Sequence, residues 1–273
     1  SPDPLDLIAH FGADAVRLGM LLTSPAGNDL PYDDSLCEQG RNFNNKIWNA
    51  FRLVKGWEVA NIEQPESARM AVKWFDAQLN KTLIEIDDLF SKYRLSEALM
   101  AVYKLFWDEF SSWYLEMAKP AYQKPIDRTT YEATLGFFDS LLKVLHPFMP
   151  FITEELWQAL EDRKEGESIM VTLQPKATEV DDTLIANFEY AKEIIAGIRT
   201  VRLQKNIPNK EVLSLQIIGE HNGAFDAVIA KLSNLETIEK VINKKSILSV
   251  SFLVGTTEYN VILGRMINID EEI

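Results

Sequence analysis

Apolar residues recur at intervals of three and four along two neighbouring stretches of the sequence, and this spacing constrains the fold more than any other feature. In the first stretch, from about residue 67, the apolar positions are Phe75, Leu79, Leu83, Ile86 and Phe90. In the second, from about residue 96, they are Val102, Phe106, Phe110, Trp113 and Met117. Such spacing places each set on one face of an α-helix. Because Pro65, Pro120 and Pro125 mark short breaks around these stretches, we predict a bundle of long amphipathic helices.

Further helices are predicted on both sides of this pair. A short helix, a turn at Gly12 and a second helix from about 13 to 23 open the chain, and a long helix follows from about 34 to 57. Another runs from about 128 to 145 and leads into HPFMPFITEELW, residues 146–157. That apolar run is too short to span a membrane, which takes about 20 apolar residues. We interpret it as a helix corner at which Pro150 opens the next helix, in preference to a catalytic role for His146.

The pattern changes near residue 166. The stretch SIMVTLQP, residues 168–175, is predicted to be a short strand, and a polar linker follows it. Beyond the linker we expect a helix over about 187–207, a strand at VLSLQIIG, a helix at GAFDAVIAKLS, and two paired strands around Gly255. The predicted fold is therefore mainly α, a helix bundle followed by a small α/β domain. The expected domains are a connector over 1–34, the bundle over 35–178 and the α/β domain over 183–273.

The composition narrows the classes of function. The chain has one cysteine, Cys37, which excludes an intrachain disulfide and a cysteine-rich zinc site. Its histidines, His10, His146 and His221, lie far apart without metal-ligand spacing, and its glycines form no phosphate-binding loop. We predict no catalytic residue and no metal site. With neither a long apolar run nor a signal peptide, the expected setting is cytoplasmic.

The charge is strongly acidic overall but reversed in one segment. A net charge of -13 argues against nucleic acid unless the chain carries a local basic face. The segment GRNFNNKIWNAFRLVKGW, residues 40–57, has no acid between Glu38 and Glu58. On a helix, one face would hold Phe43, Ile47, Ala50, Phe51 and Val54, and the opposite face Asn42, Asn45, Lys46, Asn49, Arg52 and Leu53. Arg41, another cation of the segment, is a further candidate binding residue. Asparagine is a mediocre helix former, so a stripe of it indicates recognition of a polyanion with readable edges, the alternative being a merely solvated face.

A second, smaller basic stripe is predicted on the helix after the linker. It consists of Arg199, Arg202 and Lys205. Contact with phosphate and a solvated or bridging role remain equally open for it.

Four motifs in this order resemble the valyl-tRNA synthetase family, in the region after its catalytic core. They are GADAVRLGMLLTSPAGNDL, RNFNNKIWNAFRLV, WDEFSSWYLEMAKP and LHPFMPFITEELW. The last motif is shared with the isoleucyl and leucyl enzymes, so the same region of isoleucyl-tRNA synthetase is one alternative. A free-standing helical adaptor that binds protein, for which an acidic surface would be natural, is the other.

The resemblance implies a function and a set of partners. The segment before about Asp34 resembles the stem-contact connector, and the bundle resembles the anticodon-binding domain that meets the anticodon through Lys46, Asn49, Arg52 and Leu53. ATP and Mg would act in upstream catalytic and editing domains of the same chain, which are expected to precede this segment. The segment itself needs no cofactor, would be inactive alone, and would bind valine tRNA and no membrane. The stripe of Arg199, Arg202 and Lys205 would then be a candidate contact with the tRNA backbone.

Overall fold

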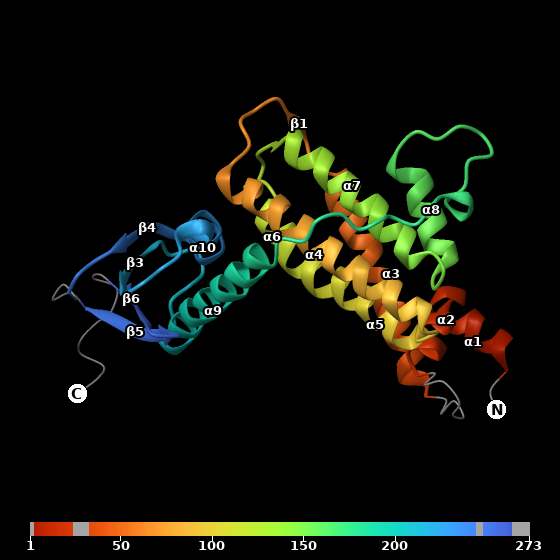
Figure 1. Cartoon of the computed structure of the whole chain (residues 1–273), viewed down its shortest axis with the longest axis horizontal. Coiled ribbons are helices and arrows are strands. Elements are labelled where there is room, and N and C mark those ends of the chain that lie inside the picture. The colour runs from red at the N-terminus through yellow and green to blue at the C-terminus, as the bar shows by residue number, and fades with distance from the viewer. Residues whose placement is uncertain (1–2, 24–32, 244–247, 264–273) are drawn as a thin grey trace. The chain divides into compact units, whose positions relative to one another are not determined.

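The computed structural model describes residues 3–23, 33–243 and 248–263 and confirms a mainly helical chain with a small sheet (Figure 1). The chain divides into two compact units. Unit 1 comprises residues 1–64 and 75–180, and unit 2 comprises residues 65–74 and 181–273. The division after Val180 falls at the predicted linker. The segment 1–34 groups with the bundle instead of separating from it, and the assignment of 65–74 to unit 2 was not foreseen.

The first two helices of unit 1 attach to the third by close backbone contact. Helix α1 spans Pro4–Phe11, Gly12 takes a φ of 90°, and α2 spans Ala13–Leu22, as predicted. Helix α3 spans Asp34–Lys55. A Cβ on Gly40 of α3 would lie 2.4 Å from the carbonyl oxygen of Ala15, and one on Gly19 would lie 2.8 Å from the backbone of Leu36. Because only glycine fits at these two positions, α2 lies directly against α3.

The helices that follow α3 in the bundle enclose an aromatic core. They are α4 (Glu66–Ser91), α5 (Leu95–Lys104), α6 (Leu115–Ala118), α7 (Arg128–Leu145) and α8 (Pro150–Leu160). Phe75, Phe106, Phe110, Tyr114 and Phe138 are fully buried. The ring of Phe110 lies 5.2 Å from that of Phe75 and 5.5 Å from that of Phe138, centroid to centroid. Such aromatic pairs add to the free energy that burial of their area contributes.

A change of helix pitch alters which residues of the second predicted apolar face are buried. Between α5 and α6 the chain forms a ten-residue π-helix, Leu105–Tyr114 (η1), in which hydrogen bonds reach five residues along the chain instead of four. The wider turns rotate the following side chains. Tyr114 is therefore fully buried, and Trp113, predicted to be in the core, is only half-buried.

The corner at residues 146–150 is tied to the start of the chain. Helix α7 ends at Leu145 and Pro150 opens α8, as predicted. Asp14 of α2 accepts hydrogen bonds from the first free backbone amides of α8, at 3.3 Å from Phe151 N and 2.7 Å from Ile152 N. Arg17 donates to the carbonyls of Pro147 and Phe148 at 3.1 and 3.2 Å. These hydrogen bonds therefore join two of the sequence motifs, the one that contains Asp14 and Arg17 and the one at residues 146–157.

Two short segments of unit 1 differ from expectation. The stretch predicted as a strand at 168–175 contains a 3-10 helix instead, Ile169–Val171 (η2), because the Ser168 hydroxyl accepts from Met170 N at 3.1 Å and starts a helical turn. A two-residue parallel pair, β1 (Val59–Ala60) with β2 (Ile126–Asp127), was not predicted.

Unit 2 places a long helix against a four-stranded sheet. Its elements are α9 (Asp182–Gln204), β3 (Leu213–Ile218), η3 (Gly223–Phe225), α10 (Asp226–Ser233), β4 (Leu235–Lys240), β5 (Ser249–Val254) and β6 (Thr257–Ile262). The strand order is β4-β3-β6-β5, with β3 and β4 parallel and the other pairs antiparallel. Gly255, with a φ of 58°, makes the predicted turn between β5 and β6. A Cβ on Gly197 would overlap the Phe252 ring, so this glycine lets α9 approach β5 closely.

Candidate nucleic-acid interface

Helix α3 carries the candidate site, and its ends are fixed by specific contacts. The Asp33 carboxylate caps its first turn by accepting from Ser35 N at 2.9 Å. Near the other end, the Lys55 ammonium donates to the carbonyl of Leu160 at 2.9 Å. The predicted inner face is confirmed, since the side chains of Phe43, Ile47, Ala50, Phe51 and Val54 are buried. These contacts hold the outer face in a fixed orientation.

The outer face presents the residues that the sequence predicted. Arg41, Asn42, Asn49 and Arg52 are exposed, Leu53 is 43% exposed and Lys46 is half-buried. Within the described chain, the side chains of Asn42, Asn49 and Arg52 have no hydrogen-bond or ion-pair partner. An asparagine amide both donates and accepts, and a guanidinium donates in a planar fork. The face therefore offers base-edge and phosphate contacts that the protein itself leaves unused.

Two of the cations on this face rest on aromatic rings. The Lys46 ammonium lies 5.2 Å from the ring centroid of Trp107, and the Arg41 guanidinium lies 5.6 Å from that of Phe11. Trp107 in turn stacks on Tyr103, with centroids 5.5 Å apart and an interplanar angle of 14°. Cation–π contact restricts where a side chain points and leaves its charge intact. The two cations are thus partly pre-positioned beside aromatic rings, of which that of Phe11 is buried and that of Trp107 is half-buried.

The sequence analysis did not include one exposed aromatic residue of this candidate interface. Trp48 is 42% exposed and precedes Asn49 on the outer side of α3, with its ring 6.5 Å from that of Phe51. An exposed indole beside cations is a platform on which an unpaired base can stack. The signal was present in the sequence, because Trp48 lies outside the five-residue buried stripe of the same helix.

The cations near the end of α3 also have a structural explanation. Arg52 and Lys55 lie in the last turn, where positive charge offsets the helix dipole. That effect accounts for these two residues alone. Arg41, Lys46 and the asparagines lie earlier in the helix, so the dipole does not explain the face as a whole.

The second predicted stripe, on α9, is not continuous. Arg202 is 4% exposed, and its guanidinium donates to the carbonyls of Pro208, Glu211 and Ser233 at 2.9, 2.9 and 2.8 Å. Burial lowers the pKa of this guanidinium, and the charge of Glu211 raises it. The bridging alternative therefore holds for Arg202, and its predicted contact with a tRNA backbone is not supported. Arg199 is exposed and Lys205 is half-buried.

Comparison with known proteins identifies the family. The family model described as the anticodon-binding domain of tRNA ligase matches residues 72–217, more than half of the chain. This chain belongs to that family. The matched region begins in α4, runs through the bundle and ends within β3, while α3 precedes it.

Three relatives of this chain, from three bacteria, are all valine--tRNA ligases. The chain is 69% identical to a valine--tRNA ligase of Parabacteroides distasonis and 66% identical to one of Phocaeicola vulgatus, over 100% of its own length. It is 37% identical over 87% of its length to a valine--tRNA ligase of Fusobacterium nucleatum. The chain spans 31% of the length of the first two relatives. Among solved structures, the ternary complex of Agrobacterium radiobacter K84 agnB2 LeuRS-tRNA-LeuAMS matches with 19% identity over 67% of this chain and 21% of its own, at a TM-score of 0.45, too low to support an argument.

Neither a metal site nor a membrane-spanning helix is found among the described residues. No cluster of three or more histidine, cysteine, aspartate or glutamate side chains is placed to hold a metal ion. No helix there combines the length and apolar character needed to cross a membrane.

Proposed function

We propose that the chain is the tRNA-recognition part of a valine–tRNA ligase and that the outer face of α3 binds the anticodon of valine tRNA. The observation that carries this proposal is the acid-free outer face, on which Asn42, Asn49 and Arg52 have no partner within the described chain. Membership of the anticodon-binding family supplies the class of ligand. The enzyme name shared by relatives up to 69% identical favours valine over isoleucine and a ligase over a free-standing adaptor.

The chemistry of the anticodon matches particular residues. Valine anticodons have adenine in the middle position and cytosine last. Adenine presents an acceptor beside a donor amine, which one asparagine amide can pair with through two hydrogen bonds. We assign this contact to Asn49. Lys46 and Arg52 lie about one turn to either side and hold phosphates or base acceptors, Leu53 packs on a base, and Arg41 and Asn42 extend the face.

Activity of the whole enzyme requires parts outside this chain. ATP and Mg would act in the catalytic domain of the longer protein, and no residue described here is assigned to hold either. The partners are valine tRNA and the upstream catalytic and editing domains, in the cytoplasm.

Binding of matched tRNAs tests the proposal. Fluorescence anisotropy would compare the 273-residue chain with valine tRNA and with the same tRNA changed at the middle anticodon base. We expect the altered tRNA to bind more weakly by about 1–3 kcal/mol, the free energy of one bidentate base contact. Equal affinity for the two tRNAs would reject anticodon recognition by this chain.

A further inference from the structure

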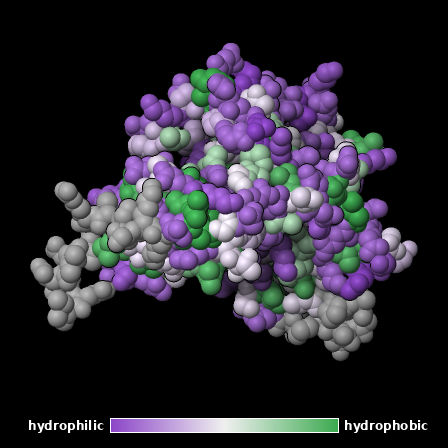
Figure 2. Space-filling view, turned by 60° about the vertical axis from the view of Figure 1, so that its left-hand side comes forward, coloured by the Kyte–Doolittle hydropathy of each residue, from purple (hydrophilic) through white to green (hydrophobic). Residues whose placement is uncertain are grey.

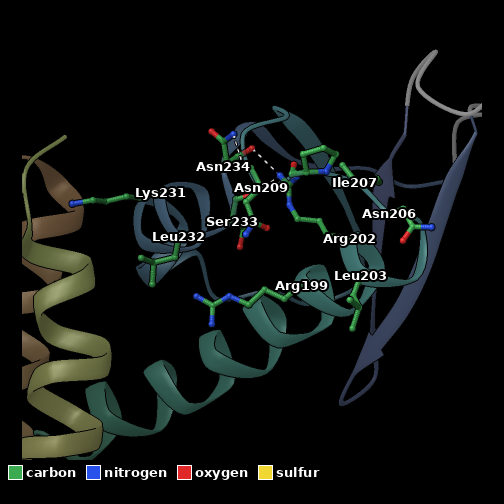
Figure 3. A pocket seen from close by; sticks show the side chains of 11 residues that line it. Arg199, Arg202, Leu203, Asn206, Ile207, Asn209, Lys231, Leu232, Ser233 and Asn234 are labelled. Atoms are coloured by element: carbon green, nitrogen blue, oxygen red, sulfur yellow. Dashed lines mark hydrogen bonds between the residues drawn. The ribbon is translucent and has the colours of Figure 1, made fainter. Parts of the chain in front are cut away.

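Unit 2 contains a cavity of about 750 Å³ that the anticodon face does not explain (Figure 3). It lies between the last turns of α9, the turn that follows them and the end of α10. Its polar lining includes Arg199, Arg202, Asn206, Asn209, Lys231 and Ser233. Among the described residues around it, none of the lining side chains is acidic, in a chain whose net charge is -13. Its volume is within the range of about 300–1,000 Å³ typical of small-molecule sites.

Hydrogen bonds from Arg202 hold the segments that form the walls of this cavity in place. Its guanidinium joins α9 to the turn at Pro208 and to the end of α10 at Ser233, with distances of 2.9 and 2.8 Å. Asn234, in a left-handed conformation, donates to the carbonyls of Asn209 and Glu211 at 3.1 Å each. Because these bonds cross between the segments that form the walls, the cavity exists without a ligand.

Cations from two helices lie around this cavity. Arg199 is exposed and extends from α9 across the cavity towards α10 (Figure 3), which carries the exposed Lys231. A guanidinium fork matches two oxygens of a phosphate, and an ammonium adds a point charge. The described lining contains no acidic side chain, so the lining itself carries only positive charge.

The rest of the lining suits the remainder of a nucleotide. Leu203 is 79% exposed and, with Leu232, offers an apolar surface for a base or a sugar face. The exposed amides of Asn206 and Asn209 can donate and accept towards hydroxyls or base edges. Ser233 Oγ is buried in the wall and has no hydrogen-bond partner within the described chain, which is unusual for a buried hydroxyl.

We propose that this cavity binds a ribonucleotide, with its phosphate on Arg199 and its base or sugar against Leu203. The proposal adds a second RNA contact, in unit 2, to the proposed function, on which it rests for the class of ligand. The phosphate could belong to an RNA strand or to a free nucleotide, and the chemistry of recognition is the same for both.

The test uses the full chain and a short oligoadenylate, which carries no valine anticodon. Anisotropy titrations compare the parent chain with Arg199→Gln and with Lys240→Gln, a matched loss of one exposed cation from β4 of the same unit. We expect Arg199→Gln to weaken binding about tenfold, as for a lost charge-assisted contact, and Lys240→Gln to bind like the parent. Competition by AMP would indicate a free nucleotide as the source, and its failure to compete would indicate a strand.

Ultraviolet cross-linking of the parent chain to the oligoadenylate gives a readout independent of any variant. Peptides covering 199–209 or 231–234 should carry the cross-link. The proposal would be overturned by any of three results. The parent chain does not bind the oligoadenylate, Arg199→Gln and Lys240→Gln lose binding equally, or the cross-links are confined to α3. An Arg52→Gln variant separates the two claims, because loss of oligoadenylate binding there alone would reject the cavity and leave the anticodon face standing.

Discussion

At the scale of single residues, helical periodicity predicted which side chains of α3 face outward, and the structure agrees from Arg41 to Leu53. The same reasoning failed for Arg202, although it lies on an equally regular helix. Its partners are carbonyls at residues 208, 211 and 233, which fold back onto α9 through the turn and α10. Periodicity within one helix carries no information about such contacts, so only the structure could reveal them.

Replacement of Trp48 tests the stacking platform. Trp48→Ala should weaken tRNA binding by about 1–3 kcal/mol, the contribution of one base stacked on an aromatic side chain. The melting temperature should change little, because the indole is 42% exposed. Ile84→Ala removes an apolar side chain that is 52% exposed in α4 and serves as the control in the same anisotropy assay. If both variants bind like the parent chain, Trp48 has no part in the interface.

The histidine of the helix corner should make stability depend on pH. Burial lowers the pKa of His146 below its ordinary value of 6.5, with opposing effects from Glu154 and Asp14, and its Nδ1 lies 2.7 Å from Thr153 Oγ1. The unfolded chain therefore binds a proton at a higher pH than the folded chain does. The associated stability is fully present above about pH 6.5 and is lost as the pH falls through the lowered folded value. Urea denaturation at a series of pH values should show a shallower acid slope for His146→Gln than for the parent, and identical slopes would contradict this assignment.

At the scale of elements, the sequence predicted the helices well because their amphipathic stripes are long and their ends carry proline, glycine or a capping acid. Helix α7 has the predicted bounds, Arg128–Leu145. Besides the short pair of β1 and β2, three elements escaped prediction for local reasons. Strand β4 is largely exposed and so lacks an alternating apolar pattern, η1 changes pitch within a continuous helix, and η2 depends on the hydroxyl of Ser168.

Replacement of Gly40 tests the close approach of α2 and α3, and replacement of Gly136 in α7 serves as its control. Gly40→Ala should destabilise unit 1 by about 1–3 kcal/mol or more, because the added Cβ would lie 2.4 Å from the carbonyl oxygen of Ala15 and a backbone atom cannot easily move away. Gly136→Ala in α7 meets nothing within 4 Å and should stabilise by about 0.5–1 kcal/mol through helix propensity. Chemical denaturation of both variants measures the difference. Equal effects of the two substitutions would show that the α2–α3 contact is looser than described.

At the scale of the whole molecule, hydrophilic residues cover most of the face shown in Figure 2, with hydrophobic residues in small groups. An acidic chain of net charge -13 that binds RNA must do so through local basic surfaces. The sequence predicted one such surface on α3 and a smaller basic stripe on α9. It could not predict the cavity of unit 2, whose lining is assembled from α9, the following turn and α10.

A small number of cationic contacts should give a shallow salt dependence. If Arg41, Lys46 and Arg52 each meet one phosphate, the log–log slope of tRNA affinity against salt should be about -2 to -3. Anisotropy titrations over a range of KCl concentrations measure it. An affinity that does not change with salt would point to an apolar interface and away from RNA phosphates.

Under the proposed function, the chain alone should not activate valine, because ATP and Mg would act in the catalytic domain of the longer protein. Valine-dependent exchange of pyrophosphate into ATP should stay at background for the purified chain. A longer relative such as the ligase of Parabacteroides distasonis provides the positive control. Exchange above background by the chain itself would show that catalytic residues lie within these 273 residues.

The central claim, that the two faces of α3 separate RNA recognition from stability, is tested most directly by Asn49→Ala and Phe51→Ala measured together. Melting temperature and affinity for valine tRNA, with its natural and its altered anticodon, are recorded for each variant. We predict that Asn49→Ala loses about 1–3 kcal/mol of discrimination between the two tRNAs at an unchanged melting temperature. Phe51→Ala, which opens a cavity beside Phe138, should lose about 3–5 kcal/mol of stability. Retention of full discrimination by Asn49→Ala would contradict the assignment of the anticodon to this face.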